Sequence, residues 1–202
     1  VAAYASIAMH WMPEILYRFR RVCPNIDVDL RMVDNAIEPF ELLEKGRTDV
    51  IFAAKQAGFS CDWTPLCQDA MYAILPPDYP LDGQETFPIE AFEGKEFLMP
   101  YGKFDLDVKA ALSANNVKPK IRPCHVDDET VIRMVGKGLG LSMMAEMMIR
   151  GRTNGVTAVP IEPATGRELG MGLHMRESMP DGILRLRECV LAFIGTLPGT
   201  ES

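Results

Sequence analysis

The first thirty residues, VAAYASIAMHWMPEILYRFRRVCPNIDVDL, place the tightest limit on how this chain can fold. Residues 1–4 are small and apolar, apolar residues recur at helical spacing over 12–22, and apolar and polar residues alternate over 26–31. This order predicts a βαβ unit, because two parallel strands need a crossover connection such as a helix. Ser6 is the expected N-cap of the helix, and Cys23-Pro24-Asn25 is expected to end it.

A βαβ unit also indicates where a ligand would bind. The helix begins at the carboxyl edge of the sheet, where open α/β sheets bind ligands, and its backbone N–H groups and dipole favour an anion there. Ser6 is therefore a candidate contact for a small organic molecule that carries a carboxylate or another acceptor-rich group. A serine that only caps its helix explains the local sequence equally well.

The rest of the chain repeats strand and helix patterns in two successive α/β regions. In the first, a helix over 36–45 ends at Gly46, a continuous apolar strand covers 50–54, and residues 55–65 have the composition of a loop. Leu66 and residues 71–75 are extended segments before a Pro-, Asp- and Gly-rich stretch, 76–93. The remaining sequence predicts strands at 96–99, 120–126, 141–144, 156–161 and 169–175, and helices at 89–92, 105–115, 128–135, 145–150 and 181–197.

Local signals mark several helix ends. Asp127-Asp128 is expected to cap the helix over 128–135, Asp181 is expected to cap the last helix, and Pro198-Gly199 to end it. The glycines of Gly136 to Gly140 follow a helix and open a strand, whereas a dinucleotide-binding loop follows a strand and opens a helix. This run therefore predicts a helix C-cap and not a nucleotide site.

The composition excludes several classes of protein. A net charge of −7, a pI near 5.0 and scattered basic residues argue against nucleic-acid binding by this chain itself. No apolar run approaches the roughly 18 to 20 residues of a membrane span, and the N-terminus lacks the features of a signal peptide. The hydrophobic content of 48% instead predicts a soluble, globular protein. Val1 lies inside the first expected strand, as in a fragment of a longer chain.

Cysteines and histidines give no sign of a metal site or a catalytic group. The five cysteines share no C-x-x-C spacing, so we expect reduced thiols, with a Cys61–Cys67 redox pair as the alternative. His10, His125 and His174 are too far apart to predict a metal site or a catalytic triad. We expect no cofactor, no metal and no enzymatic activity.

Four groups of residues occur along the chain in an informative order. They are Ser6-Ile7, Met12-Pro13, Phe19, Cys23-Pro24 and Ile26; Leu43, Gly46, Asp49 and Val50 to Ala53; Pro65-Leu66, Asp69 and Met71 to Pro76; and Val135, Gly136 and Gly138 to Leu141. Each group is loose, but the ordered set resembles the effector-binding domain of LysR-type transcriptional regulators over essentially the whole chain. Where that family has a leucine-proline and a tyrosine-proline pair, this chain has Met12-Pro13 and Cys23-Pro24.

The resemblance implies a fold and a function. The expected fold is α/β, with two Rossmann-like subdomains joined by two crossover strands, as in type 2 periplasmic-binding proteins. Subdomain I would comprise residues 1–69 and 167–202, and subdomain II residues 70–166. A bacterial, cytoplasmic regulator of this family senses a small organic effector in the cleft between its subdomains. Its winged helix-turn-helix, which binds DNA, is absent from this chain.

The resemblance also implies which residues meet the effector. They are Ser6, Ile7, Asn35, Ala36, Ala53 and Ala54 from subdomain I, and Pro100, Tyr101, Phe104, His125, Val126 and Asp127 from subdomain II. His125 and Asp127 replace residues that are often apolar in the family, which leaves the charge of the effector open.

Partners and alternatives follow from the same resemblance. Relatives pair head to tail, so we expect a homodimer in which the helix over 12–22 lies beside the helix over 105–115 of the second copy, and a tetramer for the full-length protein. A solute-binding protein of a transporter shares the fold and is the alternative function. An enzyme on this fold is less consistent with the sequence, because no set of residues can be assigned as acid, base and nucleophile.

Overall fold

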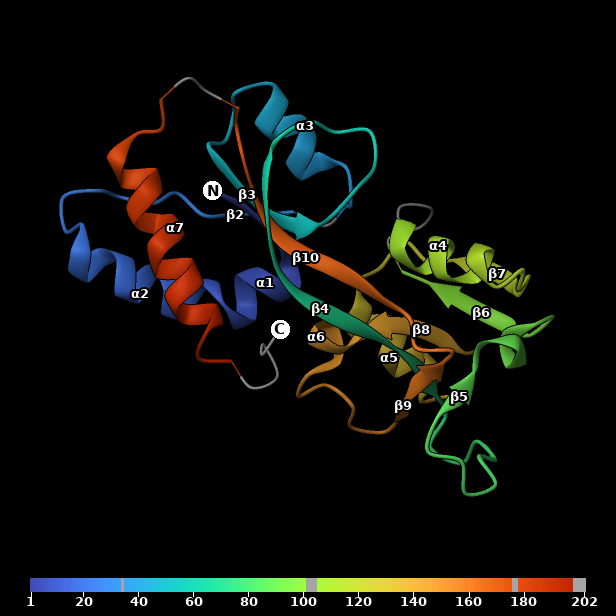
Figure 1. Cartoon of the computed structure of the whole chain (residues 1–202). Helices are drawn as coiled ribbons and strands as arrows, with labels where there is room; N and C mark the ends of the chain where they lie inside the picture. The colour runs from blue at the N-terminus through green and yellow to red at the C-terminus, as the bar shows by residue number, and fades with distance from the viewer. Residues whose placement is uncertain (34, 101–104, 176–177, 198–202) are drawn as a thin grey trace. The chain divides into compact units, whose positions relative to one another are not determined.

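The computed structural model describes residues 1–33, 35–100, 105–175 and 178–197 (Figure 1). The chain forms two compact units, Val1–Gln68 with Glu168–Ser202 (unit 1) and Asp69–Arg167 (unit 2). Strands β4 (Asp62–Leu75) and β10 (Gly166–Leu173) each contain one of the boundaries, so the chain crosses between the units twice within strands. The predicted α/β class with two crossing strands is confirmed.

The centre of unit 1 is a parallel sheet of three short strands. β1 (Ala2–Tyr4) lies between β2 (Arg31–Val33) and β3 (Val50–Ala54), and β10 pairs with β3 in the antiparallel direction. Every residue of β1 and β3 is buried. Such continuous apolar strands are typical of a parallel sheet that is covered on both faces.

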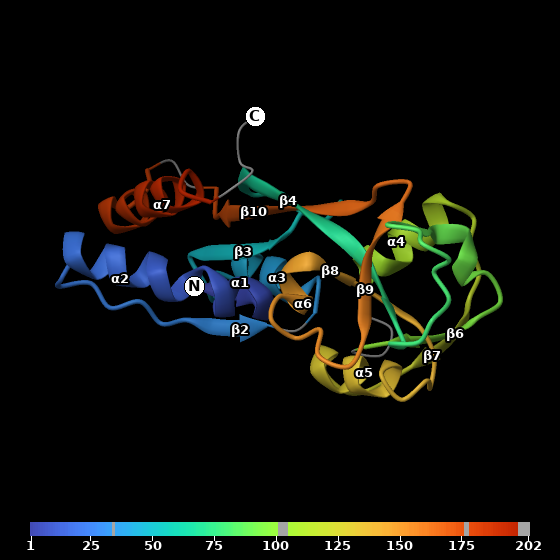
Figure 2. The same ribbon diagram turned by 90° about the horizontal axis from the view of Figure 1, so that it is seen from below.

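The described helices of unit 1 supply that cover. They are α1 (Ala5–His10), α2 (Met12–Val22), α3 (Glu38–Glu44) and α7 (Asp181–Ile194). Figure 1 shows α1, α2 and α7 on one side of the sheet and α3 on the other, and Figures 1 and 2 both show α2 beside α7. Trp11 and Phe193 meet edge to face there, with ring centroids 6.4 Å apart. Burying one large apolar side chain of this kind contributes about 1.5–3 kcal/mol.

The N-terminal helix differs from the prediction in two ways. It consists of two helices, α1 and α2, that are separated at Trp11. Ser6 is the second residue of α1 and not its N-cap, a position that Tyr4 occupies without a side-chain hydrogen bond. The reason is that β1 runs directly into α1, so the capping position falls on the last residue of the strand.

The second strand also begins later than predicted. β2 covers Arg31–Val33, whereas residues 26–30 form no strand and Ile26 is 44% exposed. β1 is three residues long and pairs in register from Ala2–Arg31 to Tyr4–Val33. The alternating residues before Arg31 therefore have no partner strand, and the alternation alone was misleading.

Two further predicted boundaries are wrong. β4 begins at Asp62, so residues 62–65 belong to a strand and not to the predicted loop. The Trp63 ring lies so close to Gly170 that an added Cβ there would collide with it, and Trp63 Nε1 donates to Glu168 Oε1 at 2.8 Å. Asp181 is the first residue of α7, and Pro180 precedes it as the N-cap. The predicted end of this helix, Pro198-Gly199, lies outside the described residues.

Unit 2 contains antiparallel and parallel strand pairs. β4 pairs in the antiparallel direction with β8 (Ser142–Ala145) and β9 (Thr157–Glu162), and β9 pairs in parallel with β5 (Phe87–Pro88). A separate parallel pair joins β6 (Glu96–Met99) to β7 (Lys120–Pro123). The strand with Pro123 therefore lies at an edge, where a residue without an N–H donor is tolerated.

The helices of unit 2 agree well with the sequence. They are η1 (Ile89–Phe92), α4 (Leu106–Ala114), α5 (Asp128–Val135) and α6 (Glu146–Ile149). Asp127 caps α5 as predicted, with Oδ1 accepting from Thr130 N at 2.9 Å. Phe92 lies between Phe87 and Phe97 in the core, with ring centroids 4.8 and 5.3 Å away.

Candidate functional site

The predicted site residues of unit 1 lie together at the carboxyl edge of its parallel sheet. Ser6 and Ile7 follow β1, Asn35 and Ala36 follow β2, and Ala53 and Ala54 end β3. The three strands are parallel neighbours, so their carboxyl ends meet at one edge. Tyr4 Oη donates to Ala36 O at 3.2 Å, which links the end of β1 directly to the segment after β2.

These residues differ in how far solvent can reach them. Ile7, Ala53 and Ala54 are fully buried, whereas Ser6 and Ala36 keep 7% and 8% exposure. Ser6 lies in the first turn of α1, where the first N–H groups of a helix have no acceptor within that helix. This turn can therefore offer hydrogen-bond donors to an anion.

Asn35 is held by the start of α3. Its Oδ1 accepts from Ile37 N at 3.0 Å and from Glu38 N at 2.8 Å, and its Nδ2 donates to Glu38 Oε2 at 3.4 Å. An asparagine that accepts two backbone N–H groups fixes the turn in which it lies. Asn35 thus has a structural role that the sequence analysis did not predict.

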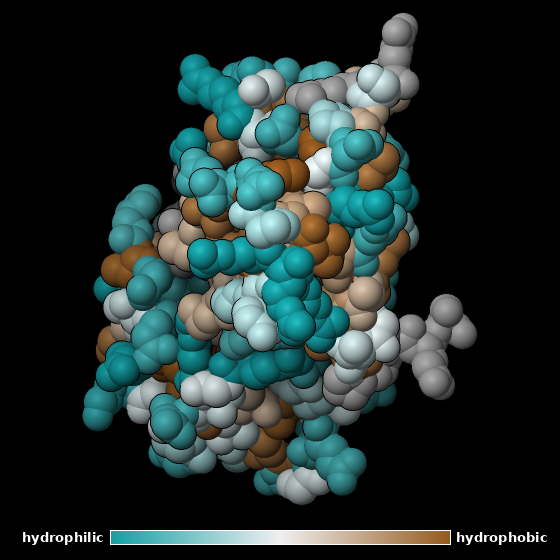
Figure 3. Space-filling model, turned by 90° about the vertical axis from the view of Figure 1, so that its left-hand side faces the viewer, coloured by the Kyte–Doolittle hydropathy of each residue, from teal (hydrophilic) through white to brown (hydrophobic). Residues whose placement is uncertain are grey.

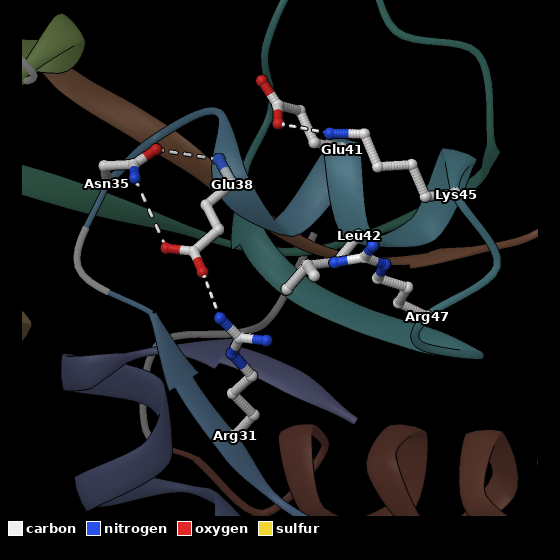
Figure 4. A pocket seen from close by; sticks show the side chains of 7 residues that line it. All are labelled: Arg31, Asn35, Glu38, Glu41, Leu42, Lys45 and Arg47. Carbon is white, nitrogen blue, oxygen red and sulfur yellow. Dashed lines mark hydrogen bonds and ion pairs between the residues drawn. The ribbon is translucent and has the colours of Figure 1, made fainter.

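Asn35 also lines a pocket of about 350 Å³ beside α3 (Figure 4). The other lining residues are Arg31, Glu38, Glu41, Leu42, Lys45 and Arg47. Arg31 Nη2 is 2.7 Å from Glu38 Oε1, and Lys45 Nζ is 2.8 Å from Glu41 Oε2. Both pairs are well exposed, and such pairs contribute little to stability. The pocket is polar and largely neutralised from within.

A larger pocket of about 630 Å³ lies at the opposite, amino end of the same strands. Ala2, Phe19, Val50 and Leu186 give it an apolar floor, and charged residues of both signs surround its opening. Ser6 and the other predicted contacts of unit 1 do not line it.

The predicted site residues of unit 2 form a second group. Pro100 follows β6, and His125, Val126 and Asp127 follow β7 just after Cys124. β6 and β7 are parallel and paired up to Met99–Pro123, and Cys124 N donates to Met99 O at 2.8 Å. His125, Val126 and Asp127 are exposed, whereas Pro100 is buried. The predicted contacts Tyr101 and Phe104 lie outside the described residues.

Asp127 supplies a fixed negative charge to this group. Hydrogen bonds from the side chain and backbone of Thr130 hold the pKa of Asp127 below its usual range, and Arg152 adds to the effect. The side chain is therefore a carboxylate at neutral pH. An effector that approaches Asp127 needs a hydrogen-bond donor there.

The sequence analysis missed a cluster of charged residues in unit 2. Arg167 lies between Asp69 and Asp107, and Asp105 caps α4 nearby. Burial, and to a smaller extent the negative charge of Asp107, raises the pKa of Asp105 to about 6. The hydrogen bond from Val108 N–H and the positive charges of Arg167 and Lys109 lower this pKa but do not outweigh the rise. No local signal in the sequence reveals this cluster, because Asp69 and Asp107 are 98 and 60 residues away from Arg167.

The described residues give no positive sign of metal or thiol chemistry. Among them, no group of three or more His, Cys, Asp and Glu side chains is placed to hold a metal ion. Burial, assisted by Asp62, raises the pKa of the Cys61 thiol, which disfavours its reactive thiolate. None of the helices in this described part is long and apolar enough to cross a membrane.

Comparison with known proteins decides the family. The model of the family described as "LysR substrate binding domain" matches residues 1–194. The chain belongs to this family. The resemblance seen in the sequence is therefore confirmed, and both crossing strands of this LysR substrate-binding domain fall inside the matched region.

Curated relatives are longer than this chain. The HTH-type transcriptional regulator TtuA of Agrobacterium vitis is 25% identical over 176 residues, which cover 84% of this chain and 57% of TtuA. The probable HTH-type transcriptional regulator LrrA of Synechococcus elongatus is 24% identical over 165 residues, 81% of this chain and 52% of LrrA. The chain thus spans little more than half the length of these relatives.

Solved structures confirm the fold class. The regulatory domain of CcmR from Synechocystis PCC6803, in complex with 2-PG, has a TM-score of 0.83 at 18% identity, covering 98% of this chain and 97% of that one. The BenM effector-binding domain with its effector benzoate has a TM-score of 0.82 at 19% identity, and the match covers 100% of this chain and 94% of the BenM chain. The effector-binding domain of QuiR in complex with shikimate has a TM-score of 0.80 at 14% identity, and the match covers 96% of this chain and 95% of the QuiR chain.

Proposed function

We propose that this chain is the effector-sensing part of a LysR-type bacterial transcription regulator. The observation that carries the proposal is the family match over residues 1–194, together with relatives that are HTH-type transcriptional regulators. Effector binding would shift an equilibrium between arrangements of the two units, and the longer protein would pass this shift to DNA. The same match favours a regulator over a transporter's solute-binding protein.

The effector would be a small organic molecule with a carboxylate or similar group. Ser6 and the first turn of α1 offer N–H donors and a hydroxyl, and Asn35 and Ala36 lie beside them. Ile7, Ala53 and Ala54 would support this surface from behind, since they are fully buried. Pro100, His125, Val126 and Asp127, with Tyr101 and Phe104, would contact the effector from unit 2. In support, benzoate, which is named as the effector of BenM, and shikimate, which is in complex with the QuiR domain, are both carboxylates.

The partners follow from the same proposal. The chain would form a homodimer, and the full-length regulator a tetramer in the cytoplasm. DNA would be bound through the N-terminal segment of the longer protein, because this chain carries a net charge of −7 and no clustered basic surface is evident in its sequence.

Thermal shift with small acids tests the effector site. Benzoate, shikimate and further small organic acids are titrated against the parent chain and against Ser6→Val, which keeps the size but removes the hydroxyl. A true effector raises the unfolding temperature as its concentration increases. At a concentration of 100 times Kd it adds about 2.7 kcal/mol to the free energy of unfolding. Ser6→Val should reduce this stabilisation.

A matched control is Ser113→Val on the exposed surface of α4, which should bind as the parent does. If Ser6→Val binds a stabilising acid as tightly as Ser113→Val does, Ser6 is not an effector contact. If no acid stabilises the parent at millimolar concentration, the carboxylate part of the proposal fails.

A further inference from the structure

Unit 2 contains a buried ion network centred on Arg167. Its Nε donates to Asp69 Oδ2 at 3.0 Å, Nη2 lies 2.9 Å from the same oxygen, and Nη1 lies 3.3 Å from Asp107 Oδ2. The side chains of Arg167, Asp69 and Asp107 are 9%, 2% and 16% exposed. One guanidinium therefore holds two carboxylates in a place that water barely reaches, where charge interactions are strong.

The network joins four elements of the unit. Asp69 belongs to β4, Arg167 to β10 and Asp107 to the first turn of α4. The second oxygen of Asp69 accepts from Met147 N in α6 at 3.0 Å. Arg167 of β10 contacts both β4, through Asp69, and α4, through Asp107. A displacement of one of these elements therefore alters the contacts of the others.

Two residues of the network lie at the boundaries of unit 2. Asp69 is the first residue of unit 2 and Arg167 the last, so the network lies where the chain enters and leaves the unit. Next to Arg167, a Cβ on Gly166 would come within 2.9 Å of Asp69 O, so the glycine allows the two strands to approach closely. The two crossing strands are thus fixed to unit 2 at the residues where the chain enters and leaves it.

The other end of the network is close in sequence to the proposed effector segment. Asp107 is in the first turn of α4, and Asp105 caps that helix by accepting from Val108 N at 3.1 Å. Asp105 directly follows residues 101–104 in the sequence, which contain Tyr101 and Phe104. An effector that touches this segment would therefore act on the turn that carries Asp107.

We propose that Arg167 is a positioning residue that couples the first turn of α4 to both crossing strands. The inference rests on the proposed effector-sensing function, which it extends from binding to transmission. The physical reason is that breaking either contact costs free energy, because the released carboxylate loses its counter-ion in a place that water barely reaches. A movement of Asp107 therefore shifts Arg167, and through it β10, Asp69 and β4.

Hydrogen exchange of the 202-residue chain without a ligand tests this coupling. The variant Asp107→Asn keeps the side-chain size and removes the charge that Arg167 holds. Amide exchange should accelerate at least about threefold in residues 69–73 and 165–168, far in sequence from the substitution. Asp78→Asn is the matched control, since Asp78 is an exposed carboxylate of the same unit. It should leave both crossing strands at the parent rate.

Two further comparisons keep the test sharp. The amides of β3 in unit 1 serve as an internal reference, because global destabilisation would accelerate them as well. Arg167→Lys keeps the charge but presents a single ammonium in place of the planar fork, so it should loosen both the crossing strands and α4. If Asp107→Asn accelerates only residues 105–112, the coupling does not exist and Asp107 is a local helix-start residue.

The outcome is independent of the ligand. If no acid binds in the thermal-shift experiment, the exchange result still decides whether the network couples α4 to the strands. If acids bind but the exchange of the strands does not respond to Asp107→Asn, the proposed function stands and the positioning role of Arg167 is wrong.

Discussion

At the residue scale, Asp105 makes the clearest prediction about pH. Burial and the neighbouring Asp107 raise its pKa from the usual 3.8 to about 6 in the folded chain. A raised carboxyl pKa means that the folded state binds the proton more tightly, so stability is lost as the pH rises from about 4 through 6. A shift of this size is worth about 3 kcal/mol at most.

Asp105→Asn should remove this pH dependence and keep the helix cap, because asparagine caps as well as aspartate does. We expect the variant to match the parent near pH 4 and to exceed it by up to about 3 kcal/mol at pH 7.5. Urea unfolding, followed by circular dichroism at three pH values, measures the free energy of unfolding. Tryptophan fluorescence is less suitable, because Trp11 and Trp63 both lie in unit 1, whereas Asp105 lies in unit 2. A difference between variant and parent that is the same at every pH would show that Asp105 titrates normally.

Single residues also show where sequence reasoning works. The cap of Asp127 and the helix end at Gly46 depend on neighbours within five residues, and both were predicted correctly. The network of Arg167 was not predictable, because its partners Asp69 and Asp107 are 98 and 60 residues away. Ser6 was assigned to a cap because the sequence alone does not reveal how far β1 extends.

At the scale of elements, the end of α3 offers a test of backbone conformation. Gly46 has φ of 63°, Gly46 N donates to Leu43 O at 3.0 Å and Arg47 N donates to Leu42 O at 2.8 Å. This is the Schellman pattern of a helix end. An added Cβ on Gly46 would meet no atom within 4 Å, so a substitution changes only backbone strain.

Gly46→Ala should therefore cost about 1–2 kcal/mol, and Gly46→Asn less, because asparagine tolerates this conformation. Gly136→Ala gives the contrasting case, with φ of −59° but a Cβ 2.6 Å from Gly155 O, so its cost is steric. Urea unfolding of the three variants measures the difference. Equal losses for Gly46→Ala and Gly46→Asn would contradict the assignment to backbone strain.

Elements with strong local patterns were predicted well, and elements set by pairing were not. The helices at 89–92 and in α5 have clear apolar spacing or caps, and they lie where expected. β2 and the start of β4 were misplaced because a strand extends only as far as its neighbour offers a partner. That neighbour lies elsewhere in the sequence.

At the scale of the whole molecule, the order of the motifs along the chain was enough to predict the family, whereas the oligomeric state is still a prediction. The ordered motifs predicted the family, which the match over 1–194 confirms. The effector residues stay a prediction, because their contacts depend on a ligand. The predicted dimer uses α2 and α4, whose exposed sides carry Tyr17, Arg21 and Ala110. Figure 3 views the molecule from the side of α2 and α7, and hydrophobic and hydrophilic residues are interspersed there.

The mixed surface of α2 predicts a modest dimer that dissociates on dilution. Tyr17 is a large aromatic residue on the exposed side of α2, with 59% exposure, and the guanidinium carbon of Arg21 lies 5.9 Å from the centre of its ring. Tyr17→Asp should weaken the dimer at least about tenfold, because it replaces an aromatic contact by a charge that must be desolvated. Leu139→Ala is the control, since Leu139 is 49% exposed but follows α5, outside the predicted contact. Light scattering at two concentrations measures the mass of each protein. A parent that stays monomeric at the higher concentration would refute the dimer, and equal dissociation of Tyr17→Asp and the parent would move the interface away from α2.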